Sequence, residues 1–190
     1  EMQRSLVGSE MCIRDSYKDK LIYPEARPNT AHMALAKLED IGKLKAIVTQ
    51  NIDGLHQAAG SKVVYELHGS VLRNYCMKCH AFYDEKFILA SKGIPTCPKC
   101  GGKVKPDVVL YEEGLDEAII QNSVKAISQA DTLIIGGTSL VVYPAAGLIN
   151  YFRGNNLVLI NKSTTSADNK ADLVIHDSIG KVLYEAVKSL

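Results

Sequence analysis

The stretch DTLIIGGTSL, residues 131–140, is a short apolar run that ends in two glycines and polar residues. Such a run is typical of a strand that is covered on both faces of a sheet. Helical patterns flank it, with LDEAIIQNSVKAISQA (115–130) before it and YPAAGLINYF (143–152) after it. A strand between two helices indicates an α/β protein with a parallel sheet.

The same alternation extends along most of the chain. A helix is predicted for NTAHMALAKLEDIGK (29–43) and another for SIGKVLYEAVKSL (178–190). Further short extended runs are KAIVTQ (45–50), KVVYELHG (62–69), KPDVVLYEE (105–113), NLVLIN (156–161) and ADLVIH (171–176). We therefore expect a doubly wound, Rossmann-like parallel sheet, with ligands beyond the carboxyl ends of its strands.

Composition excludes several function classes. The 190-residue chain is 46% hydrophobic and 23% charged, with a formal net charge of +1. This balance gives no electrostatic reason to expect a nucleic acid or an anionic membrane as partner. No apolar run approaches the roughly 18–20 residues of a membrane span.

Four of the five cysteines form two Cys-x-x-Cys pairs, with seventeen residues between the pairs. Paired cysteines without a secretion signal favour a metal in a reducing compartment, which places the protein in the cytoplasm. Four thiolates fill a tetrahedral zinc shell and leave no open position, so the zinc is expected to be structural. His80 is a rival ligand. The predicted ligands are Cys76, Cys79, Cys97 and Cys100.

The organisation follows from these patterns. Residues 1–16 show no clear periodicity of apolar residues, no helix cap and no turn motif. We expect a foreign or disordered tail that includes the isolated Cys12. Residues 17–70 and 107–190 are expected to form a partial Rossmann-like domain. Residues 71–106 are expected to form an inserted zinc-ribbon module, too small to build a core without metal.

Polar residues follow several predicted strands. TQNIDGLHQ follows the strand at 45–50, and His68 lies in ELHGS at the end of the next. GGTSL and NKS follow two later strands. Each motif alone has an ordinary interpretation, because Asn51 and Asp53 suit turns and a lone histidine is more often structural. Their convergence at strand ends favours a crevice for a nucleotide-like ligand.

These residues carry a resemblance to a known family. The segments ARPNTAHMALAKLE, TQNIDGLHQAAG, ELHGS, the paired cysteines, KPDVV and GTSLVVYPAA follow one another in the order found in sirtuins. The resemblance covers about residues 17–190 and is closest to bacterial and archaeal members. It implies an NAD-dependent protein lysine deacetylase or deacylase, which transfers the acyl group to ADP-ribose and releases nicotinamide.

The resemblance also implies roles for individual residues. His68 is expected to be the general base that acts on a ribose hydroxyl, which suits an imidazole near neutral pH. Asn51 and Asp53 are expected to orient the ribose and nicotinamide. The other implied NAD contacts are Gln50, Ile52, Gly136, Thr138, Ser139, Asn161 and Asp177.

The substrate is expected to be an acyl-lysine peptide that adds as a strand between two protein segments. The implied contacts are Val108, Val109, Tyr111, Glu112 and Val141. Where the family commonly has Phe-Gly-Glu, this chain has Tyr-Glu-Glu at residues 111–113. The glycine-to-glutamate change restricts the backbone and adds a negative charge, so we expect an altered peptide preference.

The chain enters the family pattern downstream of a Gly-Ala-Gly-x-Ser loop and a Gly-Ile-Pro-Asp-Phe-Arg run, which hold the NAD phosphates in sirtuins. From this we expect weak NAD binding by the chain as it stands. Two alternatives remain open at this point. One is protein ADP-ribosyl transfer within the same family. The other is a nucleic-acid-binding zinc ribbon, which the lysines of the insert favour and its scarcity of aromatics opposes.

Overall fold

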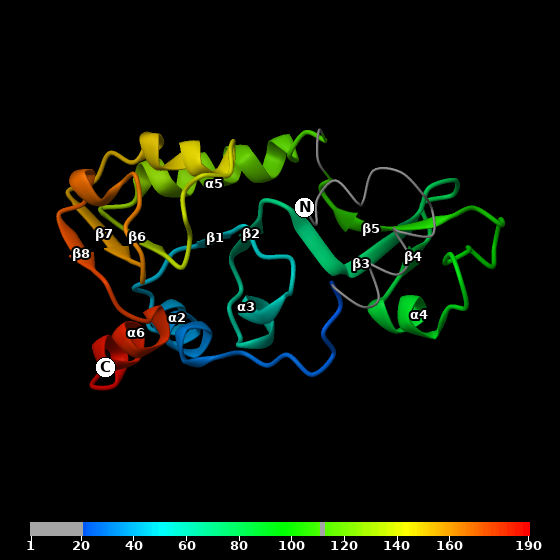
Figure 1. Cartoon of the computed structure of the whole chain (residues 1–190), viewed down its shortest axis with the longest axis horizontal. Coiled ribbons are helices and arrows are strands. Elements are labelled where there is room, and N and C mark those ends of the chain that lie inside the picture. The colour runs from blue at the N-terminus through cyan, green and yellow to red at the C-terminus, as the bar shows by residue number, and fades with distance from the viewer. Residues whose placement is uncertain (1–20, 111–112) are drawn as a thin grey trace. The chain divides into compact units, whose positions relative to one another are not determined.

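The computed structural model describes residues 21–110 and 113–190, and the chain divides into two compact units (Figure 1). The described part of unit 1 comprises residues 21–26, 51–54, 68–110 and 113–115. Unit 2 comprises residues 27–50, 55–67 and 116–190. No helix among the described residues has both the length and the apolarity needed to cross a bilayer.

Unit 2 contains the parallel strands. β1 (Ile47–Thr49) pairs with β2 (Val64–Glu66), and both run in the same direction. A second sheet has the order β6-β7-β8, also parallel throughout. Its strands are β6 (Thr132–Gly136), β7 (Asn156–Ile160) and β8 (Leu173–Ile175). The predicted Rossmann-like α/β fold with parallel strands is confirmed.

Helices cover both faces of the β6-β7-β8 sheet. On one face, α2 (Thr30–Asp40) and α6 (Ile179–Val187) pack together over β7 (Figure 1). Their shared core comprises Ala31, Ala34, Ile160, Leu183 and Val187. The Asn29 side chain begins α2 by accepting the Ala31 and His32 N–H groups, as an N-cap residue does.

The remaining helices of unit 2 are short apart from α5 (Glu117–Gln129), which begins at the Asp116 cap. They are α3 (Leu55–Ala58) and the 3₁₀ helices η2 (Ala145–Tyr151) and η3 (Asp168–Lys170). The sequence predicted an ordinary helix at residues 143–152. The structure instead has tight i→i+3 turns there, such as the Gly147 N–H bond to the Pro144 carbonyl.

The prediction that β6 is buried on both faces was wrong. Ile134 at its centre is 40% exposed. β6 is the first strand of its three-stranded sheet, so one of its edges lacks a neighbour within that sheet. An apolar cavity of about 110 Å³ lies against this strand and is also lined by Val48, Ile127 and Leu148.

Unit 1 contains an antiparallel sheet with the order β4-β3-β5. The strands are β3 (Gly69–Cys76), β4 (Phe82–Tyr83) and β5 (Val104–Val108), with the short helix α4 (Glu85–Ala90) beside them. The part of the predicted extended run that lies in β5, residues 105–108, is therefore not part of the parallel sheet. The core of unit 1 comprises Ile22, Val71, Cys76, Ile88, Cys97 and Val104.

The core of unit 2 provides a stability test. Leu159 of β7 is completely buried, whereas Leu173 of β8 is 50% exposed. We expect Leu159→Ala to lower the free energy of unfolding by about 2–5 kcal/mol, because it removes buried methyl groups and leaves a cavity. Leu173→Ala is the matched control and is expected to cost much less. Denaturant melts that show equal losses for both variants would contradict this packing.

Candidate active site and metal centre

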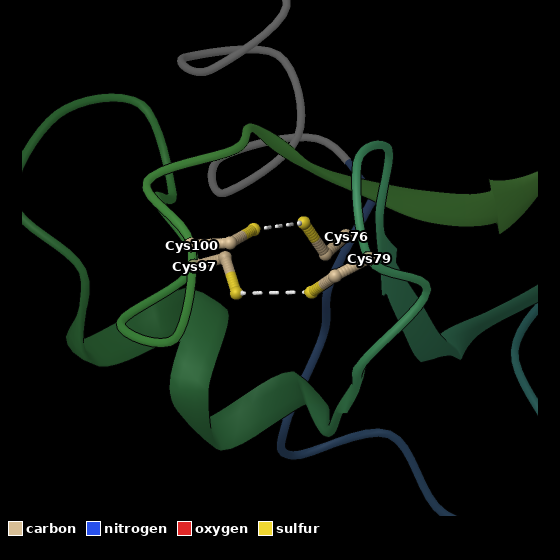
Figure 2. A group of neighbouring side chains, drawn as sticks. All are labelled: Cys76, Cys79, Cys97 and Cys100. Carbon is tan, nitrogen blue, oxygen red and sulfur yellow. Dashed lines mark hydrogen bonds between the residues drawn. The ribbon is translucent and has the colours of Figure 1, made fainter.

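The four predicted cysteine ligands converge on one point. Their sulfur atoms all lie within 4.8 Å of one another (Figure 2). The Cys76 and Cys100 sulfurs are 3.4 Å apart, and those of Cys79 and Cys97 are 3.6 Å apart. A tetrahedral zinc with Zn–S bonds of about 2.3 Å requires sulfurs at close to these separations. The donor set therefore fits one zinc ion with a closed shell.

Two similar turns bring the cysteines together. In the first, the His80 N–H bonds to the Cys76 carbonyl at 2.9 Å. In the second, the Gly101 N–H bonds to the Cys97 carbonyl, also at 2.9 Å. The cluster found among the described residues consists of the four cysteines and does not include His80, which removes the rival ligand.

A tyrosine supports the metal centre. The Tyr83 hydroxyl lies 3.0 Å from the Cys97 sulfur, which is buried, and donates to it when Cys97 is a thiolate. This hydrogen bond is the main cause that lowers the pKa of the Cys97 thiol to about 6. The same bond is the main cause that raises the pKa of Tyr83 to about 12. Tyr83 thus favours the thiolate form that binds zinc. Sequence reasoning missed it, because spacing identifies ligands but not their neighbours.

His68 lies between β2 and β3, next to the predicted substrate segment. Its carbonyl accepts the Val109 N–H at 3.1 Å, and Gly69 pairs with Val108 in the antiparallel ladder. Gly69 has a φ of +75°, and a Cβ there would lie 1.9 Å from the Asp107 carbonyl oxygen. Only glycine allows this close approach of β3 and β5. The structure thereby brings His68 together with Val108 and Val109.

The segment 51–54 is anchored to the same sheet. The Ile52 carbonyl accepts the Val71 N–H at 3.0 Å and also the Ser70 hydroxyl at 3.4 Å. Ile52 packs against the core of unit 1, while Asn51 is exposed and Asp53 is half-buried. Unit 1 therefore holds Asn51, Ile52, Asp53, His68, Val108 and Val109. Tyr111 and Glu112 lie outside the described residues.

The other predicted NAD contacts belong to unit 2. Gly136 ends β6, Asn161 directly follows β7, and Asp177 comes shortly after β8. Because these strands are parallel and adjacent, the three residues share the carboxyl edge of one sheet. Gln50 directly follows β1, at the carboxyl end of the other parallel pair.

The loop after β6 has a defined backbone. Gly137 has a φ of +63° and bonds through its N–H to the Ile160 carbonyl. The Thr138 hydroxyl accepts the Leu140 N–H at 3.2 Å. Ser139 follows in this loop, and Val141 is 69% exposed. Thr138, Ser139 and Val141 thus lie in a turn that projects from the carboxyl end of β6.

A hydrogen-bonded loop beside Asn161 was not predicted. The Asp168 carboxylate accepts the Thr165 N–H and hydroxyl at 2.8 and 2.7 Å, and these bonds hold the pKa of Asp168 below its usual range. His176 lies between this carboxylate, at 3.3 Å, and the Asn161 carbonyl, at 3.1 Å. The network ties the loop after β7 to the end of β8. Its contacts join residues three, eight and fifteen positions apart, and the sequence analysis did not single out Thr165, Asp168 or His176.

The family comparison agrees with this geometry. The Sir2 family model matches residues 8–144. An NAD-dependent protein deacetylase of Clostridium perfringens (strain 13 / Type A) is 77% identical over 172 residues, which are 90% of this chain and 70% of that protein. The protein of the same name from Clostridium tetani (strain Massachusetts / E88) is 63% identical over 177 residues, which are 93% of this chain and 72% of that protein.

Solved structures resemble the fold closely. A Sir2 homologue in complex with NAD has a TM-score of 0.88 and 34% identity, covering 98% of this chain and 74% of that one. Sir2 with a p53 peptide and NAD+ has a TM-score of 0.85 and 36% identity, and the match covers 95% of this chain and 77% of that one.

Zinc content tests the metal centre. We expect one zinc per chain in the wild type and a loss of tight zinc binding in Cys97→Ser, because three thiolates leave the shell open. Cys12→Ser is the matched control and should keep the metal. Full zinc occupancy of Cys97→Ser by elemental analysis after dialysis would rule out this ligand set.

The tyrosine contact makes a separate prediction. Tyr83→Phe removes the hydrogen bond to Cys97 and should weaken zinc binding by about 10–100-fold, as with other groups that bond to metal ligands. Tyr75→Phe, at an exposed ring on the neighbouring strand, is the control and should leave zinc affinity unchanged. Competition with a chromophoric chelator measures both, and equal affinities would show that Tyr83 does not support the metal.

Proposed function

The chain belongs to the Sir2 family, and from this we propose that it is an NAD-dependent protein lysine deacetylase that releases nicotinamide. The curated relatives that bear this name support the proposal. They do not favour ADP-ribosyl transfer or a nucleic-acid-binding ribbon as the main activity. Bound NAD would supply the labile nicotinamide bond and the ribose hydroxyl that accepts the acyl group.

The observation that carries the proposal is the hydrogen bond from the Val109 N–H to the His68 carbonyl. It fixes the backbone of the proposed base beside the proposed peptide-binding edge. In this proposal, His68 takes the proton from the hydroxyl that attacks, because an imidazole nitrogen can act as a general base. Val108 and Val109 would bind the acyl-lysine peptide by strand addition, with Val141 as a second contact.

The remaining site residues are proposed to hold the cofactor. Asn51, Ile52 and Asp53 would orient the ribose and nicotinamide, because the Ile52 carbonyl anchors their segment to β3. Further NAD contacts are proposed at the carboxyl edge of unit 2, since adjacent strand ends present backbone and side-chain groups at one edge. The residues proposed there are Gln50, Gly136, Thr138, Ser139, Asn161 and Asp177.

The zinc is proposed to be structural, because four thiolates leave no position for water or substrate. We also propose residues 71–106 as the zinc module and residues 17–70 and 107–190 as a partial Rossmann-like NAD-binding domain. The expected tail, residues 1–16, lies outside the described residues. Free thiols that bind metal persist in a reducing compartment, which supports the cytoplasm as the location.

His68→Ala tests the mechanism in the full-length product of the gene. Loss of a general base should lower deacetylation of an acetyl-lysine peptide by about 100–10,000-fold. Zinc content and melting temperature should stay close to wild type, because the His68 backbone bond to Val109 remains. A variant that melts early but deacetylates at a near-normal rate in the cold would show a structural role instead.

The same assay tests the reaction class. Nicotinamide release from NAD should require the acetylated peptide and should be accompanied by deacetylated product. Transfer of ADP-ribose to protein without deacetylation would favour the other reaction of the family. Tight oligonucleotide binding with a steep salt dependence and no NAD-dependent reaction would favour the nucleic-acid interpretation.

A further inference from the structure

Two hydrogen bonds join Glu113 to Leu110, which lies two residues after the end of β5. The Glu113 N–H donates to the Leu110 carbonyl at 3.1 Å. The carboxylate of Glu113 also binds Leu110: its Oε2 atom accepts the Leu110 N–H at 2.9 Å. Leu110 is thus held by Glu113 through both its backbone N–H and its carbonyl, one residue after Val109.

The second carboxylate oxygen of Glu113 is bound to β5. Lys105 Nζ donates to Oε1 at 2.6 Å. Lys105 lies within β5, where its backbone pairs with Tyr75 of β3. The lysine and glutamate side chains are 34% and 44% exposed, so the pair is partly shielded from water. The hydrogen bond from Lys105, followed by that from the Leu110 N–H, lowers the pKa of Glu113 and keeps it ionised near neutral pH.

These contacts form a brace across the proposed peptide-binding segment. One end of the brace is on the strand, at Lys105, and the other end is beyond it, at Leu110. Val108 and Val109 lie between the two anchored points, and the Val109 N–H is bound to the His68 carbonyl. A segment fixed on both sides loses less conformational entropy when a peptide adds to it as a strand.

We propose that Glu113, braced by Lys105, is a positioning residue that, by fixing Leu110, holds Val108 and Val109 in the form that receives the acyl-lysine peptide. This inference rests on the proposed function, because it assigns the substrate to that edge. Glu113 acts through the backbone of Leu110 and takes no part in the chemistry. It therefore affects peptide affinity and leaves the rate at saturating peptide unchanged.

The test compares Glu113→Gln, Lys105→Met and wild type in the full-length product of the gene. Peptide affinity is measured by titration of an acetyl-lysine peptide without NAD, and kcat and both KM values are measured by steady-state kinetics. A hydrogen bond to a charged group contributes enough that Glu113→Gln should raise the peptide Kd and KM about tenfold or more. Lys105→Met should have a smaller effect, because the carboxylate still binds Leu110. The KM for NAD and the kcat should change less than twofold in both.

A matched control and an independent readout complete the experiment. Lys86→Met, at an exposed lysine of α4 in the same unit, should bind peptide like wild type. Hydrogen exchange of the Leu110 amide should accelerate in Glu113→Gln and not in Lys86→Met. Lys105→Met tests the brace if Glu113→Gln fails to fold.

The outcomes separate this inference from the proposed function. If the wild-type protein binds the peptide and Glu113→Gln binds it with the same affinity, the positioning role is overturned and the deacetylase proposal stays intact. A fall in kcat at unchanged KM would also overturn it, because that pattern indicates a role in the reaction step. A wild-type protein that neither binds nor deacetylates the peptide would overturn the proposed function, and this inference with it.

Discussion

The antiparallel pairing of β3 with β5 is the interaction on which unit 1 depends. At one end of the ladder Cys76 pairs with Val104, next to the converging thiols. At the other end Gly69 pairs with Val108, and the next hydrogen bond joins the His68 carbonyl to Val109. The metal centre and the proposed reacting edge are therefore two ends of one ladder. A shift of one residue in its register would turn every side chain of β3 to the opposite face.

Unit 2 relies on a different constraint, the parallel alignment of β6, β7 and β8. Their carboxyl ends lie at one edge, which gathers Gly136, Asn161 and Asp177, residues that are 16 to 41 positions apart in sequence. The Asn161 N–H bond to the Ile175 carbonyl and the His176 contact to Asp168 then fix the loops that leave this edge. Strand order positions the groups, and loop hydrogen bonds fix their backbone.

Most of the fold and the metal ligands could be predicted because they follow local rules. Short apolar runs between helices predict parallel strands, and the Cys-x-x-Cys spacing predicts a four-thiolate shell. The antiparallel partner of β5 could not be read in this way, because its pairing depends on residues 28 to 39 positions away. The same limit applies to exposure: the sequence TLIIG is typical of a buried strand, yet Ile134 is 40% exposed, because burial depends on which distant elements cover the strand. The Tyr83–Cys97 and Glu113–Lys105 contacts were missed because they are set by side-chain geometry that no spacing rule describes.

The β3–β5 ladder has one irregularity, a shift of register between Ser70 and Asn74 opposite Pro106. Proline has no N–H to donate, so the ladder is interrupted at the position where the strand bulges. The interruption divides the ladder into two parts, one beside the cysteine cluster and one that holds Gly69 opposite Val108. The Arg73 guanidinium, which lies within the bulge, donates to the Asp107 carboxylate at 2.8 Å and so ties the two strands together where their backbone pairing is broken.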